Sequence, residues 1–234
     1  MNAPITDKAT TVAFSFNGKQ ITASGGETIL QAAKRNGYEI PHLCYSDNLR
    51  ADGNCRACMV EIDGERALAP SCCRQPNNDM TVRGDSGRAR KAQSLVLELL
   101  RGEVGNSHFS NRSELDYWCD QLEVTESRFG SRQQPVGDAS HPAISVNLSA
   151  CIQCTRCVRA CREEQANDVI GFAHRGIHSE IVFDLGDSMG ESSCVGCGEC
   201  VQACPTGALM PAGGVGLEAM DRTVDSVCPY CGVG

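Results

Sequence analysis

The chain repeats one cysteine spacing, in CIQCTRCVRAC at residues 151–161 and in CVGCGECVQACP at residues 194–205. Both runs follow C-x2-C-x2-C-x3-C, and Pro205 directly follows the last cysteine of the second run. Three thiols spaced in this way allow one loop to occupy three corners of a cube-shaped group. We expect the fourth cysteine to begin a helix that leads away toward a second such group. The repeat therefore predicts two paired metal-cluster sites.

This is the spacing of a bacterial ferredoxin with two [4Fe–4S] clusters, in which the fourth cysteine of each run ligates the other cluster. The predicted ligands are Cys151, Cys154, Cys157 and Cys204 for one cluster, and Cys161, Cys194, Cys197 and Cys200 for the other. Small residues between them, such as Gly196 and Gly198, let backbone N–H groups approach the sulfurs. Structural zinc is the alternative, because it also binds C-x2-C pairs. The repeated run of three, closed by Cys-Pro, favours iron–sulfur.

Composition indicates a reduced environment for these thiols. The chain has 234 residues, which suggests one or two domains, and 16 of them are cysteine. Residues 1–11 (MNAPITDKATT) lack the charged segment and apolar core of a signal peptide. The most apolar run, LVLELL at 95–100, is short and contains a glutamate, so we expect no contact with a membrane. We therefore expect a cytoplasmic protein whose cysteines bind metal rather than form disulfides.

The charge pattern excludes one class of partner. The formal net charge is −8 and aromatic residues make up 5% of the chain, which argues against nucleic-acid binding. The sequence contains no convincing Ser/His/Asp or paired-carboxylate constellation, so we predict no catalytic residue on this chain.

Residues 1–88 are predicted to form one small domain. VAFSFNGKQITAS alternates in polarity around Asn17-Gly18, which indicates a β-hairpin. GGETILQAAKRNG predicts a helix that Thr28 caps and Gly37 ends. ACMVEIDG and ERALAPS predict two further strands joined at Asp63-Gly64.

A third cysteine constellation lies in this segment, with ligands predicted at Cys44, Cys55, Cys58 and Cys72. Strands and a helix around a cysteine-rich loop resemble a plant-type, β-grasp [2Fe–2S] ferredoxin. The C-x10-C-x2-C spacing differs from the plant C-x4-C-x2-C and is similar to the first domain of the large iron–sulfur subunit of respiratory complex I. In PSCC the resemblance favours Cys72 as the ligand, and Cys73 is then expected to be an ordinary small buried residue.

Residues 89–142 are predicted to be a helical linker. One helix should run from Ser86 or Asp85 to Arg101, with an apolar stripe at Ala92, Leu95, Val96, Leu99 and Leu100. A second should begin at Ser113 and bury Leu115, Trp118, Cys119 and Leu122, which makes Cys119 a core residue rather than a ligand. Isolated His108 and His141 are expected at the surface or as caps. Complex I relatives carry an H-x3-C-x2-C-x5-C cluster site in this region, and because this chain has no cysteine pair there, we predict that the site is absent.

Residues 143–215 should hold the two [4Fe–4S] clusters. DVIGFAHRG and HSEIVFDLG predict a strand pair between the two cysteine runs, with His174 and His178 at the surface. ACPTGAL at 203–209 predicts a helical turn after Cys204.

Residues 216–234 contain a further pair, Cys228 and Cys231, in SVCPYCGVG. A zinc knuckle or a redox pair is a possible reading of the pair alone. In context it resembles the start of a molybdopterin oxidoreductase domain, whose C-x2-C-x3-C opening binds a [4Fe–4S] cluster. The third ligand would follow Gly234, so we expect either a truncated longer chain or an incomplete third cluster.

The whole order resembles the α subunit of cytosolic NAD-dependent formate dehydrogenase. The segments that carry this likeness are PSCCRQP (70–76), RGEVGNSHF (101–109), CREEQANDVIGFAHRG (161–176) and CVGCGECVQACPTGALMP (194–211). The resemblance implies an α+β chain with a β-grasp [2Fe–2S] ferredoxin domain, a short helical linker and a bacterial two-[4Fe–4S] ferredoxin domain.

The resemblance also implies the partners. Formate would be oxidised at a molybdenum or tungsten bis-pterin centre in a following catalytic domain or subunit. Electrons would then cross the [4Fe–4S] clusters and the [2Fe–2S] cluster to a flavin (FMN)- and NAD-binding β subunit. The alternatives are the diaphorase iron–sulfur subunit of an NAD-reducing hydrogenase, a freestanding multi-cluster electron carrier and a structural zinc protein.

Overall fold

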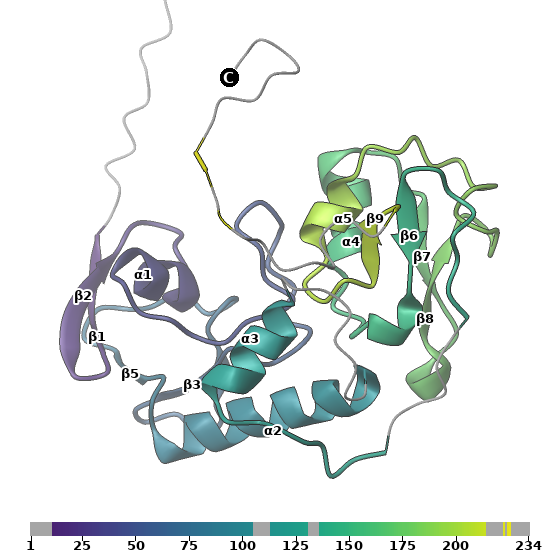
Figure 1. The fold of residues 1–234 in the computed structure, drawn as a ribbon. Helices are drawn as coiled ribbons and strands as arrows, with labels where there is room; N and C mark the ends of the chain where they lie inside the picture. Colours follow the sequence, from purple (N-terminus) through teal and green to yellow (C-terminus); the bar gives the residue numbers. More distant parts are fainter. Residues whose placement is uncertain (1–10, 105–112, 131–135, 214–221, 223, 226–234) are drawn as a thin grey trace, which may run out of the picture.

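The computed structural model describes residues 11–104, 113–130, 136–213, 222 and 224–225 (Figure 1). The predicted features at His108, Cys228 and Cys231 lie outside the described residues. In the described part of the chain, no helix is both long enough and apolar enough to cross a lipid bilayer.

The first part of the chain is built on a mixed five-stranded sheet of order β2-β1-β5-β3-β4. Its strands are β1 (Val12–Phe16), β2 (Lys19–Ala23), β3 (Met59–Ile62), β4 (Ala69–Pro70) and β5 (Thr81–Arg83). β1 pairs in parallel with β5, and the other pairs are antiparallel. Helix α1 (Ile29–Arg35) buries one face in the same apolar core as Phe14, Phe16 and Val60.

Local signals explain these elements. The predicted hairpin is confirmed, because Asn17 (φ 48°) and Gly18 (φ 78°) form a tight turn between β1 and β2. The N-cap of α1 is also confirmed: the Thr28 Oγ1 accepts from the Gln31 N–H, and the Gln31 side chain accepts from the Thr28 N–H. The strand predicted over ERALAPS is largely wrong, since only Ala69–Pro70 pair with β3.

Helices α2 (Gly87–Val104) and α3 (Glu114–Gln121) pack against each other. The predicted apolar stripe of α2 is wrong in part: Val96 and Leu100 pack against the apolar core, but Leu95 and Leu99 are 39% and 45% exposed. The buried face instead follows Ala89, Gln93, Leu97 and Arg101 at four-residue spacing. It includes polar side chains that find partners: Gln93 Nε2 donates to the Met59 and Gly84 carbonyls, and Arg101 pairs with Asp116 of α3.

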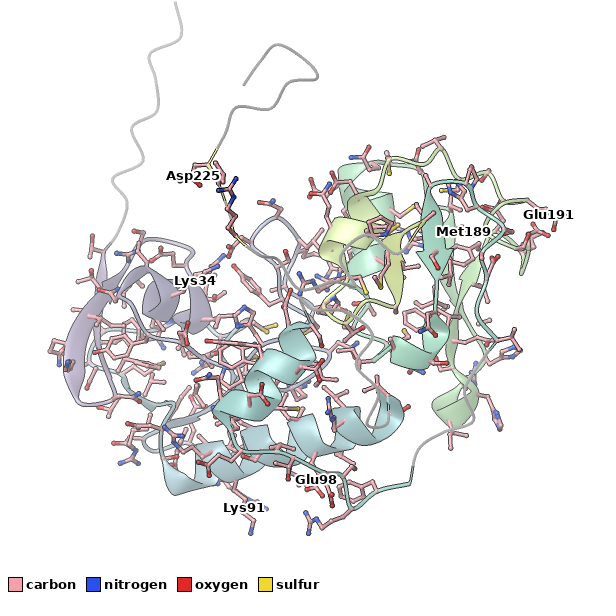
Figure 2. The ribbon with its side chains drawn as sticks, viewed as in Figure 1. Lys34, Lys91, Glu98, Met189, Glu191 and Asp225 are labelled. Atoms are coloured by element: carbon pink, nitrogen blue, oxygen red, sulfur yellow. The ribbon has the colours of Figure 1, made fainter. Side chains whose placement is uncertain are left out.

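The outer face of α2 is polar. Figure 2 shows Lys91 and Glu98 on this side of the helix. Glu98 holds Arg128 through hydrogen bonds of 2.7 and 2.8 Å, so the segment after α3 is fastened to α2. Helix α3 begins as predicted, with the Ser113 hydroxyl accepting from the Asp116 N–H, and it buries Leu115, Trp118 and Cys119.

The second part of the chain combines short helices with two antiparallel strand pairs. The strands are β6 (Ile144–Val146) with β9 (Leu209–Pro211), and β7 (Ile170–Ala173) with β8 (Glu180–Phe183). The helices are α4 (Arg156–Arg159), which continues into a π-turn at Ala160–Glu164, and α5 (Glu199–Ala203). Two 3₁₀ turns occupy Leu148–Ala150 and Gly176–His178.

The β7–β8 pair is confirmed, and the β6–β9 pair was not predicted. The helix predicted after Cys204 is wrong, because α5 ends there and the chain extends into β9. The fourth cysteine of each run therefore lies at the end of a helical segment and does not begin one: Cys161 is in the π-turn that follows α4, and Cys204 caps α5.

One apolar cluster joins the two parts of the chain. It contains Leu43 and Ala57 from the first cysteine loop, Leu97 from α2, Trp118 from α3 and Ile152 from the second cysteine run. Figure 1 shows α3 and α2 beside the space where the two parts meet. The linker helices thus hold the two cysteine-rich regions against each other.

Candidate metal centres

The first candidate centre brings together Cys44, Cys55, Cys58 and Cys72. The Cys44 thiol contacts those of Cys55 and Cys72, and the Cys58 thiol contacts that of Cys72. The Cys44 N–H also donates to the Cys55 Sγ at 3.4 Å. Three of the four side chains are almost fully buried, and Cys55 is partly exposed.

Adjacent Cys72 and Cys73 occupy different environments. Cys72 is fully buried within the set, whereas Cys73 is exposed, with its Sγ 3.6 Å from the Cys72 Sγ. The prediction that Cys73 is a small buried residue is therefore wrong. A hydrogen bond from the Cys73 N–H to the Pro70 carbonyl closes a turn here, and consecutive side chains leave it in different directions.

The four thiols of this group shift one another's pKa values. The neighbouring Cys55 and Cys72 thiols lower the pKa of Cys44, whereas the Cys44 thiol raises the pKa values of Cys55 and Cys72. The protonation of each of these closely spaced sulfurs therefore depends on its neighbours. Four thiolates would repel one another here, so a positively charged group among them is needed to hold all four deprotonated. That donor set fits a [2Fe–2S] cluster, which four cysteine thiolates hold.

The second candidate centre is a small cavity of about 20 Å³. Four cysteines line it: Cys151, Cys154, Cys157 and Cys204. The other walls are mainly apolar, including Leu148, Ile152, Ile181, Pro205 and Leu209. Burial, followed by the charge of Cys204, raises the pKa of Cys154.

The loop around this cavity has an unusual backbone. Gln153 (φ 54°) and Thr155 (φ 66°) both adopt the left-handed conformation. This curvature lets the Gln153 N–H donate to the Cys151 Sγ at 3.4 Å. Backbone N–H groups directed at sulfur are one of the means by which proteins adjust cluster potentials.

The third candidate centre groups Cys161 with Cys194, Cys197 and Cys200. Burial, then the nearby Cys194, Cys197 and Cys161 sulfurs, raises the pKa of Cys200 to about 12. Gly196 (φ 68°) and Gly198 (φ 80°) shape the loop, and the Gly196 N–H donates to the Cys194 Sγ at 3.4 Å. Cys197 is exposed, so this centre lies at the surface.

The three groups form a row. Leu43 and Cys44 of the first set lie in one apolar cluster with Ile152 and Cys154 of the second. Cys157 of the second set lies in one apolar cluster with Cys200 of the third, and after burial the charge of Cys200 is among the causes that raise the pKa of Cys157. The second group is therefore the middle one.

Two arginines between the groups were not predicted from the sequence. Arg156 Nη1 donates to the Leu43 carbonyl at 3.2 Å and forms an ion pair with Glu114 at 2.7 Å. Arg159 donates to the carbonyls of Cys44 and Cys154. Their only sequence signal is two basic residues beside Cys157 in CTRCVRAC, a pattern that exposed arginines would share.

The remaining predicted residues have structural positions. Cys119 is 2% exposed, and burial raises its pKa to about 11, as expected for a packed thiol. His141 acts as a cap, since its Nδ1 accepts from the N–H groups of Ala143 and Ile144. His174 and His178 are exposed. In the described ranges, no three His, Cys, Asp or Glu side chains converge on a site for a single metal ion.

Comparison with known families gives these groups a chemical context. Residues 9–87 match the family described as a 2Fe-2S iron-sulfur cluster binding domain, and residues 150–208 match a 4Fe-4S dicluster domain. Both matched segments are iron–sulfur domains. The [2Fe–2S] domain contains the first candidate set, and the dicluster domain contains the other two.

Known proteins with similar sequences are components of redox enzymes. The chain is 30% identical over 183 residues to a component of the NADH-quinone oxidoreductase of Rickettsia felis, which aligns 76% of this chain with 27% of that protein. It is 33% identical over 210 residues to the NADP-reducing hydrogenase subunit HndD of Solidesulfovibrio fructosivorans, covering 84% of this chain and 35% of the relative. The chain thus spans about a quarter to a third of these curated relatives.

A solved structure has the same fold over most of the chain. It is a chain of an NAD+-reducing [NiFe]-hydrogenase in the H2-reduced state, with a TM-score of 0.81 and 27% identity. The match covers 90% of this chain and 91% of that one. The fold of the two parts of this chain and of the helices between them therefore also occurs in a chain of an NAD+-reducing enzyme.

Proposed function

We propose that this chain is the iron–sulfur electron relay of a multisubunit, NAD-linked oxidoreductase. The observation that carries the proposal is the row of three cysteine groups. The middle group shares one apolar cluster with the first group and another, which contains Cys157 and Cys200, with the third. When bound, iron–sulfur clusters supply one-electron oxidation and reduction.

The proposed ligands follow the row. Cys44, Cys55, Cys58 and Cys72 would hold a [2Fe–2S] cluster. Cys151, Cys154, Cys157 and Cys204 would hold one [4Fe–4S] cluster, and Cys161, Cys194, Cys197 and Cys200 the other. The cavity that Cys204 shares with the first run supports the crossed arrangement, as does the effect of Cys161 on Cys200.

The protein's own contribution is to hold the sulfurs, exclude water and direct N–H groups at them. Apolar walls around the middle cavity and buried cysteines in the first group support this role. We assign residues 1–88 to a β-grasp [2Fe–2S] domain, 89–142 to the linker and 143–215 to the dicluster domain. The parallel β1–β5 pair with α1 beside the sheet supports the β-grasp assignment.

The finer proposal for the parent enzyme is NAD-dependent formate dehydrogenase in the cytoplasm. Two sequence features favour it: Cys228 and Cys231 in CPYCGVG (228–234), and the absence of a cysteine pair from the linker. In this reading residues 216–234 begin a molybdopterin domain. The exposed third group would receive electrons from the molybdenum or tungsten site, and the [2Fe–2S] centre would pass them to a flavin- and NAD-binding subunit.

An NAD-reducing hydrogenase is the second candidate, because the similar solved structure belongs to such an enzyme. The two candidates differ in their metals and substrates. Purification of the intact complex without air, followed by metal analysis and assays of formate- and H2-dependent NAD reduction, separates them. Molybdenum or tungsten with formate activity supports the first proposal, and nickel with H2 activity supports the second. An isolated monomer with three clusters would contradict both and indicate a freestanding carrier.

A further inference from the structure

Arg159 is a buried cation that bridges two of the candidate centres. Its side chain projects from α4 and the residue is only 4% exposed. Nη2 donates to the carbonyl of Cys44 at 2.5 Å and to that of Cys154 at 3.4 Å. Nη1 donates to the Arg50 carbonyl, and Nε donates to the Thr155 hydroxyl at 3.2 Å. One guanidinium thus contacts the backbone of a ligand residue in each of two neighbouring groups.

The charge of Arg159 is not neutralised by direct contact with a carboxylate among the described residues. Other arginines nearby differ in this respect: Arg156 pairs with Glu114, and Arg162 pairs with Asp168. Thr155, which accepts from the Arg159 Nε, in turn donates from its Oγ1 to Asp52 Oδ2 at 2.9 Å. Asp52 is itself exposed to solvent.

A buried charge without a counter-ion is costly in a folded protein. Carbonyl oxygens offset part of that cost for Arg159, and a negatively charged group held by Cys44 or Cys154 would offset the rest. Four thiolates around iron carry net negative charge, and net charge is one of the factors that set cluster potentials. The positive charge of Arg159 is therefore placed to stabilise negatively charged clusters in both the Cys44 group and the Cys154 group.

We propose that Arg159 is a positioning residue that raises the reduction potentials of the [2Fe–2S] centre and of the middle [4Fe–4S] centre together. Adding one electron makes each centre more negative, and a fixed positive charge stabilises that reduced state. Because the same guanidinium faces both centres, its loss lowers both potentials. This inference rests on the proposed electron-relay function.

The test is a redox titration of the full-length protein, purified without air and monitored by EPR spectroscopy. The comparison is made at the applied potential that reduces half of the wild-type [2Fe–2S] centres. At this potential we expect the ratio of reduced to oxidised centre in Arg159→Gln to be about tenfold lower, which corresponds to a reduction potential lower by about 59 mV for a one-electron step. One [4Fe–4S] signal should shift in the same direction. Arg159→Lys keeps the charge, and both ratios should stay within about twofold of wild type.

Arg162→Gln is the matched control, because it removes an exposed arginine three residues further along the same helical segment. It should change neither ratio by more than about twofold. Unchanged potentials in Arg159→Gln, a shift confined to one centre, or an equal shift in Arg162→Gln would overturn the proposal. A wild-type protein without iron–sulfur signals would instead refute the electron-relay function itself.

A second pair of variants decides the matter if Arg159→Gln does not assemble. Thr155→Asp puts a carboxylate beside the Arg159 Nε and neutralises the guanidinium in place. Thr155→Asn is its uncharged control, and both substitutes tolerate the left-handed backbone at this position. The Asp variant should show lower potentials at both centres than the Asn variant. Equal potentials in the two variants would contradict the proposal.

Discussion

Replacement of Cys72 by serine tests the assignment of the [2Fe–2S] centre. Cys72 is fully buried and contacts the thiols of both Cys44 and Cys58, so its sulfur is central to the group. We expect Cys72→Ser to lose the two irons of this centre and its EPR signal. The irons and signals of both [4Fe–4S] centres should remain, because their cysteines lie on other loops.

Cys73 provides the matched control for this experiment. Its Sγ lies 3.6 Å from the Cys72 Sγ, so the Cys73 sulfur would have to move by about that distance to take the place of Cys72 as a ligand. Although Cys73 is exposed, its sulfur lies against Gly53, where an added Cβ would be only 2.9 Å away. Cys73→Ser should therefore keep the complete iron content and the [2Fe–2S] signal.

The assay combines iron and sulfide analysis with EPR spectra of the dithionite-reduced variants. Loss of the [2Fe–2S] signal in Cys73→Ser, with retention in Cys72→Ser, would refute the assignment. If Cys72→Ser keeps the signal and only the double variant loses it, Cys73 has replaced the missing ligand.

Three further predictions concern other parts of the chain. Cys161→Ser should remove the [4Fe–4S] signal of the group that contains Cys200, and loss of the other [4Fe–4S] signal instead would contradict crossed ligation. Leu97→Ala should lower the free energy of unfolding by about 2–5 kcal/mol in urea titration, because Leu97 is fully buried between the two parts of the chain, whereas half-exposed Leu99→Ala should cost less than about 1 kcal/mol. Hydrogen bonds from the Ser140 hydroxyl, and then from the Met189 N–H, lower the pKa of Asp138 below its ordinary value of 3.8. Ionised Asp138 therefore stabilises the fold above pH 3.8, and this contribution is lost as the pH falls through the lower pKa of the folded state. Asp138→Asn should remove this contribution, so the free energy of unfolding should fall less steeply at acid pH than in the wild type.

The sequence predicted how most of the cysteines group in space, because the spacing within each run already brings its sulfurs close together. The runs that start at Cys151 and Cys194 need only local loop curvature to gather three sulfurs. The contact of Cys204 with the first run is long-range and followed from the repeat, and the cavity that they share supports it. The choice between Cys72 and Cys73 needed the structure, because adjacent cysteines have the same sequence pattern.

The linker was harder to predict because its packing depends on polar side chains. Counting only apolar residues selected Leu95 and Leu99, whereas the buried face of α2 contains Gln93 and Arg101. Each of these finds a specific partner elsewhere in the chain, at Met59 or on α3, which no periodicity in α2 reveals. Buried polar residues are accommodated only where such partners exist.

The short β6–β9 pair was missed for a related reason. Its two strands contain three residues each and come from opposite ends of the dicluster domain. No local turn signal connects them, and ACPTGAL at 203–209 predicted a helical turn where the chain instead leaves α5 and extends. The pairing closes the domain around the second cysteine group, because Leu209 of β9 lines the same cavity as Cys204.

The most direct test of the electron-relay proposal is the metal content and redox behaviour of the full-length protein purified without air. We predict iron with an equal amount of acid-labile sulfide, one [2Fe–2S] signal and two [4Fe–4S] signals upon reduction. Loss of the clusters on exposure to a chelator under air should abolish every one of these signals. Stoichiometric zinc without iron or sulfide would contradict the account and identify the cysteines as structural zinc ligands.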